Sequence, residues 1–357
     1  MGRARDPAAV RGLLGRARLV TLTGPGGAGK TRLARELATQ TAAGAAFPDG
    51  AWWAEFAPLT AGADPAPVVA AALGVRQPAV ADRPAALGDA LVAALGGRRL
   101  LVVLDNCEHV VDGAAALADA LLRACPKLAL LATSREALGV GGEVAWPVAG
   151  LAHPAARDLG YAPVRGAGGR SAGERGDPAA AEAFARTVAG YEAVELFVER
   201  ARTVQPGFAL TAGTAPAVAA ITAQLDGQPL ALELAAAQVA TLGVDQLAVR
   251  LDDVFAVLTR GRRGALPRHR TLRALLDWSY HLLAPAERAL LARLGAFRGA
   301  FTLDAVEAVG RGRSGSPRPP CMMRPPRRCS RWATGRAPCA TPAPPWPLRF
   351  RPSTPGS

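Results

Sequence analysis

Short apolar runs alternate with helical patterns over the first 150 residues of the chain. Two of the runs, 100–104 and 128–131, contain only apolar residues, as central strands of a parallel sheet do when helices cover both faces. We therefore predict an α/β domain over residues 1–150, built as a parallel sheet with helices on both faces. The predicted strands are 18–23, 51–56, 100–105 and 128–134, and the predicted helices are 29–41, 84–95 and 113–124.

The pattern changes after residue 150. Residues 151–189 are rich in Gly, Ala, Arg and Asp without apolar periodicity, which predicts a flexible linker. A small all-helical domain is predicted over 190–265 and a further helical unit over 266–309. Their helical patterns lie at 193–204, 217–225, 230–242, 272–283, 285–297 and 301–309.

The composition changes again at residue 310. The last 47 residues contain 12 prolines and ten arginines but no Val or Ile. Such a segment buries too little apolar surface to offset the entropy of ordering, so we expect residues 310–357 to be a disordered tail. A GC-rich gene translated in a shifted frame would give the same composition, and a frame error near codon 310 is therefore an alternative.

The tail also explains the net charge of +13. It holds ten arginines and no acidic residue, which leaves 32 basic against 29 acidic residues in the first 310. Charge is therefore weak support for nucleic-acid binding. The sequence has no apolar run of the ~18 residues that a membrane helix needs and no signal-peptide pattern, so we expect a cytoplasmic protein without a membrane partner. The spacing of the five cysteines predicts neither zinc nor disulfides.

A phosphate-binding loop lies between the first strand and the first helix. Its sequence GPGGAGKT matches G-x-x-x-x-G-K-[ST]. Glycines let backbone N–H groups cradle phosphate oxygens, and the helix amino terminus adds a partial positive charge. We predict that the loop binds ATP or ADP with Mg²⁺, with Lys30 on the β- and γ-phosphates and Thr31 on the metal. The predicted binding residues are Gly24, Gly26, Gly27, Ala28, Gly29, Lys30, Thr31 and Arg32.

Asp105 ends an apolar strand and is the predicted second Mg²⁺ ligand, although an Asp at this place can also cap the next helix. Many P-loop ATPases follow the metal-binding Asp with a second carboxylate that orients the attacking water, and here Asn106 takes that place. Glu108 could substitute, with His109 nearby, or both could be solvated residues at a helix start. We therefore expect slow or absent hydrolysis.

Arg135 follows the strand at 128–134 and should lie at the same sheet edge as the phosphates. A guanidinium suits phosphate oxygens, so Arg135 is a candidate γ-phosphate sensor. The alternative is an ordinary surface arginine in a loop. With Lys30, Asp105 and Glu108 it completes the set of candidate catalytic residues.

Six motifs in order carry a resemblance to a known family. They are the P-loop, LLVVLDNCEHV (100–110), LLATSREALGVGGEVAWPV (130–148), AVELFVERA (193–201), LDGQPLALELAAA (225–237) and RTLRALLDWSYHLLAPAERALLARLGAF (270–297). Over residues 1 to about 309 the chain resembles the NB-ARC-type module of STAND ATPases, found in bacterial transcriptional regulators of the LuxR and SARP kinds. The resemblance implies a signal-transduction switch that is closed with ADP and forms homo-oligomers with ATP. DNA would be reached only through domains elsewhere in the regulator.

The resemblance also implies roles for single positions. Pro229 matches the proline of the family's G-x-P loop, which packs against the nucleotide. Without the resemblance, the residues of this loop indicate only that one helix stops and the next begins at Pro229. Gly2 and Arg3 resemble the start of a G-R-E motif, with Ala4 in place of the acid, which suggests missing upstream sequence.

Residues 266–309 resemble the start of the family's winged helix. The rest of that unit, with its histidine for the β-phosphate, would fall in the tail, so no histidine receives this role. His269 and His281 are expected at the surface.

Two other functions stay open at this point. The chain could bind DNA through the partial winged helix and the basic tail, which would give affinity without sequence reading. It could also be a free-standing ATPase motor, which would need a second carboxylate and a trans-acting arginine that the sequence does not identify.

Overall fold

The computed structural model describes residues 6–42, 45–75, 84–154, 178–251, 280, 283–295, 297 and 302–310. The predictions made for Gly2 and Arg3, for His269 and His281 and for the tail from 311 onward lie outside these residues, as does the predicted helix at 272–283 except for residues 280 and 283. The chain divides into two units, 1–291 and 292–357, which are described separately.

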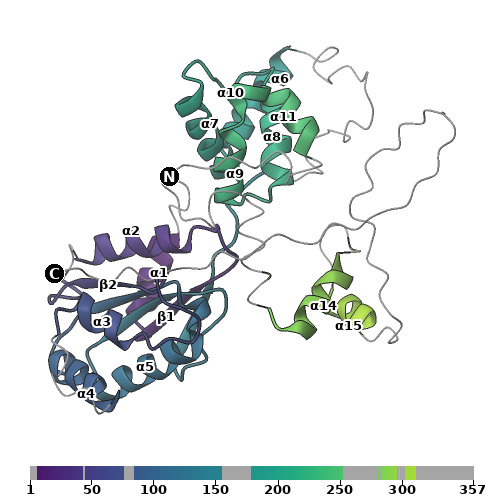
Figure 1. Cartoon of the computed structure of the whole chain (residues 1–357). Helices are drawn as coiled ribbons and strands as arrows, with labels where there is room; N and C mark the ends of the chain where they lie inside the picture. Colours follow the sequence, from purple (N-terminus) through teal and green to yellow (C-terminus); the bar gives the residue numbers. More distant parts are fainter. Residues whose placement is uncertain are drawn as a thin grey trace, which may run out of the picture. The chain divides into compact units, whose positions relative to one another are not determined.

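A five-stranded parallel sheet forms the centre of the α/β domain (Figure 1). Its order is β2-β3-β4-β1-β5, so β1 and β4 are neighbours although they are distant in sequence. The strands are β1 (Leu19–Thr23), β2 (Ala51–Glu55), β3 (Leu101–Asp105), β4 (Ala129–Thr133) and β5 (Glu143–Pro147). The first four lie where the sequence predicted strands. The fifth was not predicted, because its residues Glu-Val-Ala-Trp-Pro are half-buried or exposed and lack a clear apolar pattern.

Helices cover both faces of the sheet, which confirms the predicted fold class. Side chains alternate along a strand, so Leu100, Val102 and Leu104 pack in one apolar core, while Leu101 and Val103 pack in the other. The first core is covered by α3 (Ala66–Ala72), α4 (Pro84–Leu95) and α5 (Val111–Ala124), and the second by α1 (Asp6–Leu14) and α2 (Lys30–Ala42).

In the described part of the chain, six helices with a core of their own follow the sheet. They are α6 (Pro178–Ala189), α7 (Glu192–Val204), α8 (Ala215–Gln224), α9 (Pro229–Ala236), α10 (Val239–Leu242) and α11 (Val244–Arg250). Phe197 is fully buried in this core and meets Phe208 edge to face, with ring centroids 6.3 Å apart. A small helical domain was predicted here, although the pattern at 230–242 was taken as one helix and is two.

The linker predicted over residues 151–189 is wrong at both of its ends. Residues 178–189 form α6, which buries only Val188 and therefore has a weak apolar pattern. At the other end Leu151 is buried in the helical core, and its N–H donates to the carbonyl of Gly227 at 2.8 Å. Residues 155–177 lie outside the described part of the chain.

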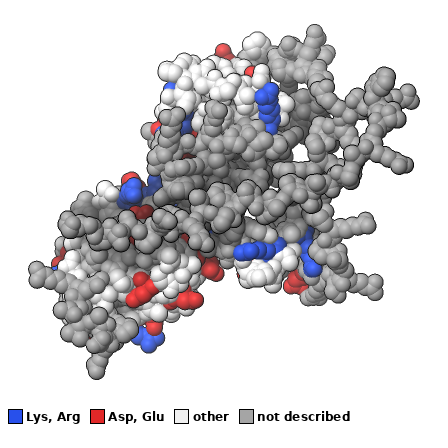
Figure 2. All heavy atoms as spheres, in the orientation of Figure 1, with Lys and Arg blue, Asp and Glu red and all other residues white. Residues whose placement is uncertain are grey.

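Helices α14 (Pro285–Leu294) and α15 (Leu303–Gly310) lie where the sequence predicted helices. Their assignment to a winged helix stays a prediction. Among the described residues, no helix has the length and apolar character needed to cross a membrane. On the face drawn in Figure 2, the described basic side chains lie in separate small groups.

Candidate nucleotide-binding site

The loop between β1 and α2 has the backbone of a phosphate cradle. Gly24, Gly27 and Gly29 have φ angles of 142°, 79° and 94°, which side chains other than glycine rarely adopt. A Cβ at Gly24 would also lie 2.8 Å from the carbonyl oxygen of Val148, directly after β5. The backbone directly after β5, the strand that the sequence did not predict, therefore packs against the loop at Gly24.

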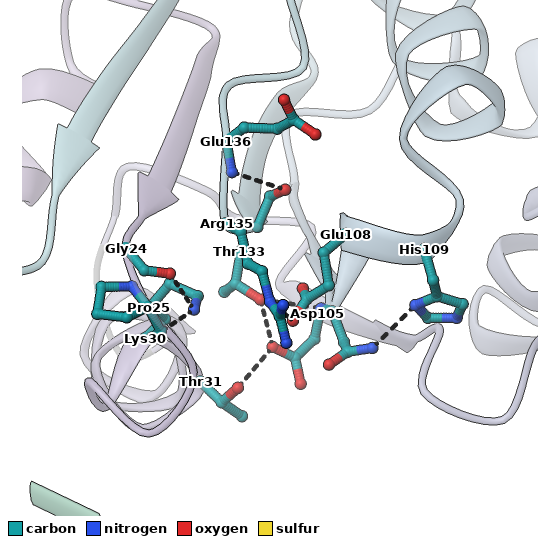
Figure 3. Close-up of polar contacts among 12 residues, drawn as sticks. Gly24, Pro25, Lys30, Thr31, Asp105, Glu108, His109, Thr133, Arg135 and Glu136 are labelled. Carbon is teal, nitrogen blue, oxygen red and sulfur yellow. Dashed lines mark hydrogen bonds and ion pairs between the residues drawn. The ribbon is translucent and has the colours of Figure 1, made fainter. Parts of the chain in front are cut away.

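Lys30 is folded over this loop. Its Nζ donates to the carbonyl oxygens of Gly24 at 2.7 Å and Pro25 at 3.0 Å (Figure 3), and the residue is only 7% exposed. Burial lowers the pKa of Lys30; Glu108 and Asp105 act against this shift and Arg135 adds to it. The ammonium group therefore occupies the position from which it can exchange backbone carbonyls for phosphate oxygens.

Asp105 lies at the carboxyl end of β3 and accepts two hydroxyl hydrogen bonds. Thr31 Oγ1 donates to Asp105 Oδ1 at 2.9 Å, and Thr133 Oγ1 donates to the same oxygen at 2.6 Å (Figure 3). Asp105 is 4% exposed. The structure thus brings the two predicted metal ligands together.

The oxygens of Thr31 and Asp105 fit Mg²⁺, which favours hard oxygen ligands and keeps several waters and substrate phosphates. Within the described ranges, no group of three or more His, Cys, Asp or Glu residues could hold a metal. A metal held here by these two side chains would therefore depend on the nucleotide for part of its coordination.

Glu108 and Arg135 form an ion pair at this end of the sheet. Arg135 Nε lies 3.7 Å from Glu108 Oε1, and the two side chains are 20% and 7% exposed. Both alternatives raised from the sequence, a solvated Glu108 and a surface Arg135, are therefore wrong. Glu108 Oε2 is buried and has no hydrogen-bond partner among the described residues, a costly arrangement that is typical of functional sites more than of structural ones.

The helical domain reaches the P-loop through the start of α9. The N–H of Leu230 donates to the carbonyl of Gly27 at 3.3 Å, and a Cβ at Gly29 would lie 3.9 Å from Pro229 Cγ. Pro229 therefore stands beside the loop. Arg32 lies on α2 and its side chain is exposed to solvent.

Several groups at the site were missed by sequence reasoning. Thr133 links Asp105 to the backbone N–H of Asn106, at 2.9 Å; it follows the predicted strand in the same string as Arg135 and could have been found there. His109 was noted without a role, and its Nε2 contacts the carbonyl of Phe56 at 2.9 Å. Backbone carbonyls such as those of Phe56 and Val148 have no sequence signal.

The model of the AAA domain family matches residues 13–139. An "Uncharacterized protein" of Mycobacterium tuberculosis is 39% identical over 311 residues, which are 87% of this chain and 68% of that protein. The chain belongs to the same family as this protein.

A longer relative has a name that states a function. A "Putative HTH-type transcriptional regulator" of Mycobacterium tuberculosis is 41% identical over 304 residues, or 85% of this chain. The chain spans 29% of the length of that regulator. A crystal structure of a STAND protein with a tetratricopeptide repeat sensor, from Pyrococcus horikoshii, also matches. The match covers 86% of the present chain and 36% of the Pyrococcus chain, with 15% identity and a TM-score of 0.36.

Proposed function

We propose that this chain is the nucleotide-operated switch of a bacterial transcriptional regulator, an NB-ARC-type STAND module of the kind found in LuxR and SARP regulators. It would bind ATP or ADP with Mg²⁺ and hydrolyse ATP slowly or not at all. The observation that carries the proposal is the 2.9 Å contact between Thr31 and Asp105. The closeness of a P-loop hydroxyl and a carboxylate supports binding of a nucleotide with Mg²⁺ at this point.

The chemistry of the site supports retention of nucleotide more than turnover. Lys30 would bind the β- and γ-phosphates, and Arg135 would bind the γ-phosphate once it separates from Glu108. Mg²⁺, when bound, neutralises charge that develops on the phosphates. The residue after Asp105 is Asn106, which cannot accept a proton as a carboxylate does, and Glu108 is held by Arg135 at 3.7 Å.

The contact at the P-loop supports a switch. Leu230 donates to Gly27, so a phosphate that reshapes the loop changes a hydrogen bond to the first turn of α9. Reshaping of the loop would thus be passed to the helical domain. As part of the same proposal, the ATP state forms homo-oligomers, and DNA is reached through other domains, because a relative that is longer than this chain is named as an HTH-type regulator.

Nucleotide-dependent melting tests the proposal. We expect Mg-ADP and Mg-ATP each to raise the melting temperature of the wild-type chain, because a ligand at a hundredfold excess over its Kd adds about 2.7 kcal/mol. Lys30→Ala should abolish most of this shift. Lys127→Ala is the matched control, because Lys127 is exposed just before β4, at the opposite edge of the sheet.

Asp105→Asn separates metal from nucleotide effects. It should reduce the difference between melts with and without Mg²⁺ while the metal-free nucleotide shift persists. A wild-type chain that melts cooperatively at an unchanged temperature with either nucleotide would refute the proposal.

A further inference from the structure

Asn106 is held on two sides at the end of β3. Its N–H donates to Thr133 Oγ1 at 2.9 Å, and its side-chain Nδ2 lies 3.2 Å from His109 Nδ1. His109 Nε2 in turn lies 2.9 Å from the carbonyl oxygen of Phe56, directly after β2. The side chain of Asn106 is thus tied through His109 to the neighbouring strand.

The direction of these bonds follows from the groups at their ends. A carbonyl oxygen only accepts, so His109 Nε2 carries the hydrogen and donates to Phe56. In the neutral imidazole Nδ1 is then an acceptor, and Asn106 must donate to it from Nδ2. This assigns the amide: Asn106 Oδ1 is turned away from His109.

The backbone of Asn106 is adapted to this arrangement. Its φ of 67° and ψ of 53° are left-handed, a conformation that costs most residues about 1–2 kcal/mol and that Asn tolerates best after glycine. The turn sends the chain into the short 3₁₀ helix η1 (Cys107–His109), which brings His109 back to β2. One local turn therefore places the residue after Asp105 and the histidine that holds it.

We propose that His109 is a positioning residue, which holds the Asn106 amide so that Oδ1, in place of a carboxylate, orients the water that attacks the γ-phosphate. This inference rests on the proposed function and adds to it. The water oxygen forms the bond to the γ-phosphorus as the bond to the β–γ bridging oxygen breaks. ADP leaves with that electron pair, and the water proton passes to the released phosphate. The amide orients the water but takes no proton, so hydrolysis is slow.

Two variants of His109 separate positioning from stability. His109→Asn puts an amide oxygen near the place of Nδ1, so it can accept from Asn106 but loses Phe56. His109→Gln puts an amide nitrogen near the place of Nε2, so it can donate to Phe56 but loses Asn106. Each variant loses one hydrogen bond, and we expect similar melting temperatures.

The test is binding of Mg-ADP with and without aluminium fluoride, which mimics the γ-phosphate under attack by water. Wild type should bind Mg-ADP more tightly when fluoroaluminate is present, and His109→Asn should keep this gain within about twofold. His109→Gln should lose about tenfold of it, the factor expected for the loss of one hydrogen bond. Affinity for Mg-ADP alone should change by less than about twofold in every variant, and the single-turnover rate of ATP hydrolysis should follow the fluoroaluminate affinity.

Asn106→Gly provides a second variant that keeps the left-handed turn without strain. It should also lose the fluoroaluminate gain. Equal gains in His109→Asn and His109→Gln, or a wild-type chain that binds Mg-ADP without any gain, would overturn the inference while the nucleotide switch stands. A wild-type chain that binds no nucleotide would instead overturn the proposed function.

Discussion

Thr133 offers a sharp test of how the site is held together. Its hydroxyl is buried at the end of β4, where the residue is 1% exposed. It donates to Asp105 Oδ1 at 2.6 Å and accepts from the N–H of Asn106 at 2.9 Å. Thr133→Val keeps the shape of the side chain and removes both bonds.

The cost of Thr133→Val can be worked from these two bonds. A buried N–H without an acceptor costs about 1–3 kcal/mol, and a hydrogen bond to a charged group contributes about 1.5–3 kcal/mol. The Asn106 N–H is half-buried and Asp105 keeps its bond from Thr31, so values near the lower ends apply. We expect the free energy of unfolding to fall by about 2.5 kcal/mol.

Urea unfolding followed by tryptophan fluorescence measures this cost, because Trp52 and Trp53 lie on β2 beside β3. Thr133→Ser, which keeps the hydroxyl, should lose much less. Thr31→Val is the matched comparison: it removes the other bond to Asp105 but strands no backbone group, and should cost about 1.5 kcal/mol, the lower end for a bond to a charged group. If Thr133→Val were as stable as Thr133→Ser, the hydroxyl would not hold the ends of β3 and β4 together.

Four further predictions follow. Gly24→Ala should lower the free energy of unfolding by about 1–3 kcal/mol and abolish nucleotide shifts in thermal melts, because its φ is 142° and a Cβ would meet the Val148 carbonyl at 2.8 Å; a stable, nucleotide-binding variant would contradict the loop geometry. Burial lowers the pKa of Lys30, so the unfolded chain binds more protons above the folded pKa. Stability should therefore rise with pH as the lysine loses its proton and on toward 10.5, and urea titrations should show this rise in wild type but not in Lys30→Met. Burial also raises the pKa of the Cys107 thiol, so mass spectrometry should find it alkylated by iodoacetamide only after unfolding, and rapid labelling of the native chain would argue against its burial. Asn106→Asp should speed single-turnover ATP hydrolysis by about tenfold or more, because a carboxylate can accept the water proton; an unchanged rate would mean that proton acceptance does not limit the reaction.

The parts of the site that the sequence predicted share one property, which is that their geometry is local. The P-loop needs only a strand, a glycine-rich turn and a helix in succession, so GPGGAGKT is sufficient to place Lys30 and Thr31. Asp105 could be paired with them because the carboxyl ends of parallel strands meet at one edge of a sheet. Arg135 was predicted near the phosphates by the same reasoning. Its ion pair with Glu108, at 3.7 Å, was not predicted.

Sequence alone thus determined the fold class, the loop and the sheet edge at which the chemistry lies, because periodicity and turn residues act over short stretches of chain. Only the tertiary structure decided the contacts that join stretches distant in sequence. The strand order β2-β3-β4-β1-β5 brings Phe56 to His109, Thr133 to Asp105 and Val148 to Gly24. Each of these contacts uses a backbone carbonyl or a common hydroxyl, and such groups occur throughout the sequence. Their partners are fixed only when folding removes water and each buried polar group must bond to the protein group beside it.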